Sequence, residues 1–123
     1  MSLLFDSNIL IGYLRNQREA LQFLEAQTEQ PAVSVVSIVE LYAGAKSRQE
    51  EQKIELLLGQ AKRLPLNVEI AQRAGAFVRI YRASHAVEPL DAIIAATAEH
   101  HGLRLATLNV KHFPMFPKLK RAY

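Results

Sequence analysis

The chain is 123 residues long, half of its residues are apolar, and it contains no cysteine. This length and apolar content predict one domain with its own core, spanning residues 1–123. Without cysteine there are no disulfides, thiolate metal sites or cysteine nucleophiles. The sequence shows no secretory signal and no apolar run long enough to cross a bilayer, so we expect a cytoplasmic protein without a membrane partner. The net charge of +3 favours an anionic partner only weakly.

Short apolar runs alternate along the chain with longer segments of helical periodicity. We expect strands at 2–6, 32–36, 66–68 and 103–107, and helices at 8–15, 18–28, 37–46, 49–62, 69–84 and 89–101. Strands that are apolar throughout are typical of burial on both faces. The alternation of strand and helix therefore predicts an α/β fold with a parallel sheet between two layers of helices.

An acid stands where the first predicted strand ends. In "LLFDSNILIGYL" (3–14), Asp6 follows three apolar residues and precedes an apolar helical pattern. Ligand sites in open α/β sheets lie beyond the carboxyl ends of the strands, so this position favours a functional role. The alternative is that Asp6 only serves the amides of the helix that begins near Asn8.

Two further acids have both a structural and a functional interpretation. In "VSVVSIVELYAG" (33–44), Ser37 and Glu40 have the spacing of a capping box, and taken alone this favours a cap. In "VEPLDAIIAATAEHHG" (87–102), Pro89 opens a helix and Asp91 falls in its first turn, where the helix dipole stabilises an acid.

The conjunction of the three acids favours function. Asp6 and Asp91 are the only aspartates, and with Glu40 each is expected at the start of an apolar helix, on one rim of the sheet. Three converging carboxylates repel one another unless a cation lies between them. Oxygen ligands without cysteine or paired histidine indicate Mg²⁺ or Mn²⁺. The corresponding chemistry is metal-assisted attack of water on a phosphodiester.

These segments, together with "EPLDAIIAATAEHHGLRLATLNVKHF" (88–113), resemble the PIN domains, specifically the VapC-type toxins of bacterial toxin–antitoxin pairs. The resemblance covers essentially the whole chain. It implies a three-layer α/β/α fold with a mainly parallel sheet of four to five strands. It also implies a Mg²⁺-dependent endoribonuclease, in which Mn²⁺ can substitute, that forms a homodimer and is inhibited by a VapB-like antitoxin.

The resemblance also assigns roles to single residues. It makes Asp6, Glu40 and Asp91 the metal-binding and catalytic acids. Polar neighbours that would orient these acids are Ser7, Asn8, Thr107 and Asn109. The fourth acid of the family lies just before the Phe or, in other members, at the position of Asn109. Here these positions hold His112 and Asn109, neither of which is an acid, so the sequence leaves open whether one or two metal ions bind.

Two other functions remain open at this point. The chain could be a catalytically weak or inactive module of the same fold that binds RNA or protein. It could also be a small phosphatase or sugar-phosphate enzyme, but no glycine-rich phosphate loop supports that class. The three retained acids favour the ribonuclease.

Overall fold

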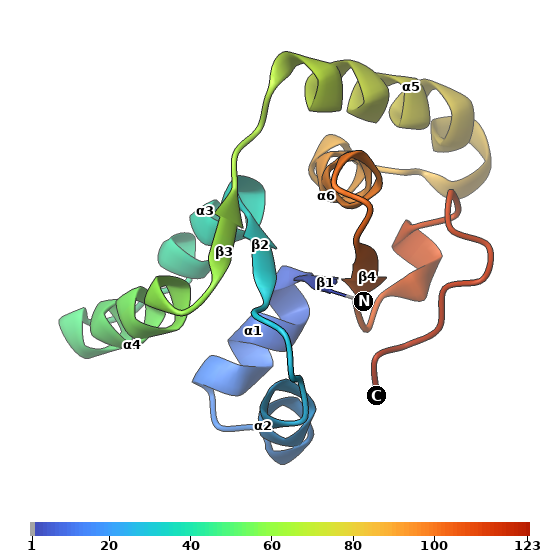
Figure 1. Cartoon of the computed structure of the whole chain (residues 1–123). Helices are drawn as coiled ribbons and strands as arrows, with labels where there is room; N and C mark the ends of the chain where they lie inside the picture. Colours follow the sequence, from blue (N-terminus) through green and yellow to red (C-terminus); the bar gives the residue numbers. More distant parts are fainter. Residues whose placement is uncertain (1) are drawn as a thin grey trace.

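Four short parallel strands form one sheet in the order β3-β2-β1-β4 (Figure 1). The structure, a computed structural model, describes residues 2–123. The strands are β1 (Leu3–Phe5), β2 (Ala32–Ser34), β3 (Lys62–Leu64) and β4 (Arg104–Ala106). The helices are α1 (Ser7–Leu14), α2 (Arg18–Glu25), α3 (Val35–Ala43), α4 (Arg48–Gly59), α5 (Val68–His85) and α6 (Pro89–His100), followed by the 3₁₀ turn η1 (Val110–His112).

Helices cover both faces of the sheet, and the strands supply a core to each. Successive residues of a strand point to opposite faces, so Leu4 packs with α5 and α6, whereas Phe5 packs with α1 and α4. Both side chains are almost fully buried. Each such burial contributes about 1.5–3 kcal/mol to stability. The predicted three-layer α/β/α architecture is thereby confirmed.

The strand order changes direction at β1. From β1 the chain continues outward through β2 and β3 on one side, and β4 then joins on the other side. The amide of Asp6 donates to the carbonyl of Ala106 at 2.9 Å, so the carboxyl ends of β1 and β4 lie side by side. Such a reversal of strand order is where open α/β sheets form their ligand sites.

One predicted strand was wrong. The segment 66–68 is not a strand: Asn67 caps α5, its side-chain oxygen accepting from the amide of Ile70 at 2.8 Å. The strand is 62–64, where Lys62 and Arg63 are exposed. Because β3 lies at the edge of the sheet, it tolerates charged side chains that the apolar pattern could not reveal.

The six predicted helices all exist, with ends that differ from the predicted ones by a few residues. Within residues 2–123, none of them combines the length and the apolar character that crossing a bilayer requires.

The end of α5 gives a test of local backbone strain. Ala86 has φ of 51° and ψ of 40°, a left-handed conformation that glycine adopts without the steric penalty of a Cβ. We expect Ala86→Gly to stabilise the protein by about 0.5–1 kcal/mol. Ala83→Gly, the same change inside the helix, should destabilise it by about 1 kcal/mol. Urea unfolding measures both, and a loss of stability in both variants would contradict this account of Ala86.

Candidate active site

Asp6 ends β1 and caps α1 at the same time. Its Oδ1 accepts from the amide of Ser7 at 2.8 Å, and its backbone is extended. The residue is only 5% exposed. No loop separates the strand from the helix, so the position of this carboxylate is set by two elements of regular structure.

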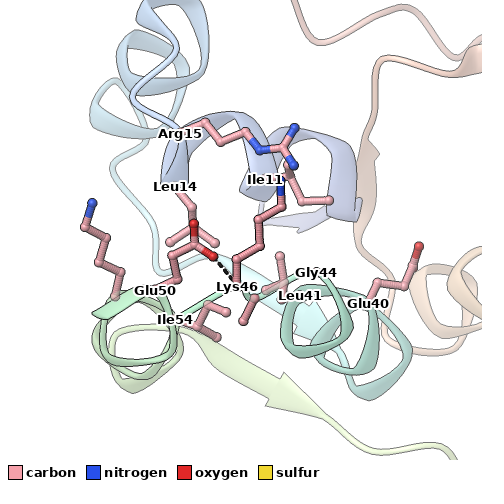
Figure 2. Close-up of a pocket in the computed structure, with 11 residues that line it drawn as sticks. Ile11, Leu14, Arg15, Glu40, Leu41, Gly44, Lys46, Glu50 and Ile54 are labelled. Carbon is pink, nitrogen blue, oxygen red and sulfur yellow. Dashed lines mark hydrogen bonds between the residues drawn. The ribbon is translucent and has the colours of Figure 1, made fainter. Parts of the chain in front are cut away.

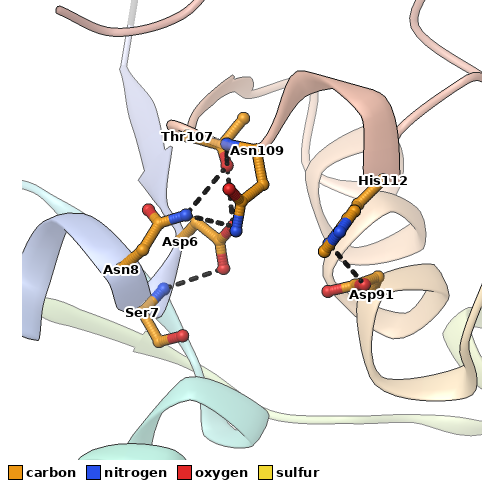
Figure 3. Close-up of polar contacts among 7 residues, drawn as sticks. All are labelled: Asp6, Ser7, Asn8, Asp91, Thr107, Asn109 and His112. Atoms are coloured by element: carbon orange, nitrogen blue, oxygen red, sulfur yellow. Dashed lines mark hydrogen bonds and ion pairs between the residues drawn. The ribbon is translucent and has the colours of Figure 1, made fainter.

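The other oxygen of Asp6 is held from β4. Thr107 Oγ1 donates to Asp6 Oδ2 at 2.7 Å, and the same hydroxyl accepts from the amide of Asn109 at 3.0 Å (Figure 3). Asn8 Nδ2 lies 3.4 Å from both Thr107 Oγ1 and Asp6 Oδ2. Asp6, Ser7, Asn8, Thr107 and Asn109 thus form one network across the ends of β1 and β4.

Asp91 faces this network from α6. Pro89 is the first residue of that helix, and Asp91 lies in its first turn. Its Oδ2 is 3.2 Å from Nδ1 of His112, which comes from η1 (Figure 3). The Asp91 side chain is 24% exposed and that of His112 is 55% exposed. His112 therefore lies at the solvent side of Asp91.

Glu40 is not part of a capping box. The helix begins two residues before Ser37, and its true N-cap is Ser34, whose Oγ accepts from the amide of Val36 at 3.1 Å. Ser37 is fully buried inside the helix, and its hydroxyl has no hydrogen-bond partner among residues 2–123. The predicted motif failed because strand β2 passes directly into α3 at Ser34. Glu40 then falls in the second turn and is half-buried.

Burial makes Asp6 hard to ionise. Removal of the carboxylate from water raises the pKa of Asp6. The hydrogen bonds from Thr107 and Ser7, and the charge of His112, lower that pKa and offset part of the effect. The network around Asp6 is therefore what makes its charged form tolerable.

The three acids also act on one another. Burial is the main cause that raises the pKa of Glu40, and the charges of Asp6 and Asp91 raise it further. Burial likewise raises the pKa of Asp91, with the charge of Asp6 adding to it and His112 opposing it. Mutual repulsion of this kind places the three carboxylates in one electrostatic environment.

The three acids are the type of ligand that a hard divalent cation prefers, but their side chains are not gathered around one point in the structure. Among residues 2–123, no three acid or histidine side chains converge closely enough to hold a metal ion as they stand. Asp91 is turned toward His112 instead. The three groups are nevertheless oxygen donors whose repulsion a cation would relieve, and Mg²⁺ accepts one or two carboxylates with water completing its shell.

A cavity of about 250 Å³ borders Glu40 on the side away from α6. It lies between α1, the end of α3 and α4, and Arg15, Lys46 and Lys53 are among the residues that line it (Figure 2). Sequence reasoning missed these cations, because they come from three separate segments without a shared motif.

Comparisons with known proteins show the family of this chain. Residues 3–118 match the family model of the PIN domain, and the chain belongs to this family. It is 45% identical over 121 residues to Ribonuclease VapC10 of Mycobacterium tuberculosis, covering 96% of this chain and 90% of the relative. It is 34% identical to Ribonuclease VapC19 of the same organism, covering 98% of each.

A solved structure is also similar over the full length. The chain superposes on a protein of a toxin–antitoxin complex from Klebsiella pneumoniae with a TM-score of 0.84 and 36% identity. The match covers 100% of this chain and 98% of the other.

The start of α3 can be tested with two matched serine variants. Ser34→Ala removes the N-cap oxygen and should destabilise the protein by about 1 kcal/mol. Ser37→Ala removes a buried hydroxyl without a partner and should be neutral or stabilising. Chemical denaturation gives the free energy of unfolding of both variants and decides whether Ser34 or Ser37 is the N-cap. A larger loss of stability for Ser37→Ala than for Ser34→Ala would support the capping box at Ser37.

The buried acids predict a pH dependence of stability in EDTA. The pKa of folded Asp6 is raised, so its favourable contribution is complete below the unfolded value of about 3.9 and is lost as pH rises through the folded pKa. Asp6→Asn has no carboxyl group to ionise at this position, so it does not lose this stability as pH rises. We expect the free energy of unfolding of Asp6→Asn, relative to wild type, to increase between the unfolded and the folded pKa of Asp6 and to level off above the folded pKa. A difference that is independent of pH would contradict the raised pKa.

Proposed function

We propose that this chain is a metal-dependent endoribonuclease that acts as the toxin of a type II toxin–antitoxin pair. The observation that carries the proposal is the meeting of Asp6, Glu40 and Asp91 in one electrostatic environment at the switch point of a parallel sheet. The names of two relatives, both ribonucleases, support the same reaction class.

Asp6, Glu40 and Asp91 would hold one Mg²⁺ ion, for which Mn²⁺ can substitute. When bound, this ion would supply positive charge that activates water and offsets the charge developing on the phosphodiester. The protein's own contribution is to hold the carboxylates that would bind the ion in position. Thr107 and Ser7 hold the two oxygens of Asp6, so this carboxylate needs little reorganisation.

Asp91 would have to turn away from His112 to hold the ion together with Asp6. In the structure its Oδ2 lies 3.2 Å from Nδ1 of His112. His112 therefore competes for Asp91, and it occupies the place where the family resemblance expects a fourth acid. We propose a site with one ion.

The partners follow from the same proposal. A structure described as a toxin–antitoxin complex is similar over the full length of this chain, which supports a VapB-like antitoxin as the inhibitory partner. The substrate is RNA, and the active unit is a homodimer.

A second function is a PIN module that binds RNA or protein without cutting. The missing fourth acid favours it, since Asn109 and His112 replace that group. The two functions differ in whether RNA is cleaved and whether that cleavage requires the three acids.

Cleavage of a single-stranded RNA tests the proposal. Wild type should cut in Mg²⁺ and stop in EDTA. Asp6→Asn, Asp91→Asn and Glu40→Gln should each lower the rate at least about 100-fold, because each removes part of a charge interaction worth several kcal/mol. Product analysis on gels gives the rates, and growth arrest on expression gives a parallel readout in cells.

Glu88→Gln is the matched control. It neutralises an exposed carboxylate at the start of the same helix as Asp91, and it should retain activity. Folding of every variant is checked by its thermal transition. Cutting by Asp6→Asn at the wild-type rate would refute the metal site, and wild type that binds RNA without Mg²⁺-dependent cleavage would establish the binding module.

A further inference from the structure

The cavity beside Glu40 has an apolar floor and a charged mouth. Its floor comes from α1, α3 and α4, through the aliphatic side chains of Ile11, Leu14, Leu41 and Ile54. Glu40 links the cavity to the acid cluster: it is one of the lining residues, and its carboxylate is turned away from Arg15 and Lys46 in Figure 2. A strand held at the three acids would reach the cavity by passing Glu40.

Cations outnumber acids around this cavity: Arg15, Lys46 and Lys53 line it together with Glu40 and Glu50. Arg15 comes from the end of α1 and Lys46 from the segment after α3, and Figure 2 shows both side chains reaching over the floor. Lys53 lines the cavity from α4. Among residues 2–123 none of the three has an ion-pair partner.

The two acids offset this charge only in part. The carboxylate of Glu50 accepts a hydrogen bond from the backbone amide of Lys46, and neither Glu40 nor Glu50 forms an ion pair with the three cations among residues 2–123. A local excess of positive charge attracts an anion. Arg15 and Lys46 supply guanidinium and ammonium donors, both of which suit phosphate.

We propose that this cavity binds the RNA strand next to the scissile phosphodiester. A backbone phosphate lies between Arg15 and Lys46, Lys53 adds charge, and the attached base and ribose rest on the aliphatic floor. The inference rests on the proposed function and extends it by assigning the substrate a direction, from the acid cluster past Glu40 toward α4.

The dimensions favour a nucleotide over a helical protein segment. An α-helix has a diameter of about 10 Å with its side chains and needs an elongated groove. A cavity of about 250 Å³ lies near the lower end of the volumes of small-ligand sites, so it suits a single nucleotide unit better than a helix. Unpaired bases of single-stranded RNA are free to enter such a cavity, whereas bases in a duplex are not.

The test is equilibrium binding of a fluorescent single-stranded RNA of about a dozen nucleotides in EDTA, at several salt concentrations. Arg15→Gln and Lys46→Gln should each reduce the slope of log affinity against log salt by about 0.7, the value for one phosphate contact on a single strand. The double variant should bind at least about tenfold more weakly at fixed salt.

Arg48→Gln is the matched control for charge. Arg48 lies two residues from Lys46, its side chain is 80% exposed, and it does not line the cavity. It should leave the salt slope within error of wild type. Equal effects of all three substitutions would mean that the protein's overall charge attracts RNA, and this result would overturn the proposal.

A second measurement locates the contact on the RNA. In oligonucleotides with one neutral methylphosphonate linkage, a single position should weaken binding to wild type but not to the double variant. If no position behaves in this way, the cavity does not hold a phosphate. Unchanged RNA binding by the variants, with weakened capture of a co-expressed antitoxin, would assign the cavity to a protein partner and also overturn the proposal.

Cleavage kinetics separate this inference from the proposed function. In Mg²⁺ the double variant should show a raised KM with kcat changed little, since it loses binding and not the acids. If wild type did not cleave RNA but its RNA binding still depended on Arg15 and Lys46, the nuclease would be refuted and the RNA-binding role of the cavity would stand. If wild type cleaved RNA and the Arg15 and Lys46 variants bound RNA as tightly as wild type, the nuclease would stand and the role of the cavity would be refuted.

Discussion

The hydrogen bond from Thr107 to Asp6 is the interaction on which the site depends. It joins the ends of two neighbouring strands that are 101 residues apart in sequence. Asp6 is almost fully buried, and an unpaired buried carboxylate would either take up a proton or destabilise the fold. The donors at Asp6, one from α1 and one beyond β4, offset this penalty and fix the direction of both oxygens. The remaining acids can then be arranged around a carboxylate that does not move.

The same region stores unfavourable interactions that a purely structural protein would not keep. The charge of Asp6 raises the pKa values of Glu40 and Asp91, the charge of Asp91 raises that of Glu40, and the buried hydroxyl of Ser37 has no hydrogen-bond partner among residues 2–123. Local rules are broken most often where function requires it. Unfavourable features also occur elsewhere, as in the left-handed backbone of Ala86, but the repulsion among carboxylates is confined to this edge of the sheet. That repulsion supports a site whose charge is balanced by a ligand.

The sequence was sufficient where a pattern was local and apolar. It predicted the three-layer fold, the helix that opens at Pro89, and the position of Asp6 at a strand end. It was misleading at Ser37, because the spacing of a capping box is present but the helix already begins after Ser34, the buried last residue of β2. It also missed β3, since an edge strand needs no apolar alternation. The contact of His112 with Asp91 and the cavity cations require tertiary structure, because no sequence spacing connects them.

The direct passage from strand to helix at Asp6 and at Ser34 restricts how this protein can diverge. Ser34 is the last residue of β2 and Asp6 directly follows the last residue of β1, and each caps the next helix, so there is no connecting loop into which residues could be inserted. A single inserted residue at either point would displace the carboxylate or rotate α3. New specificity must therefore arise by exchange of side chains on existing elements, or by changes in the longer segments that precede β2 and follow β4. Length variation among related chains should accumulate in those segments and be absent at these two junctions.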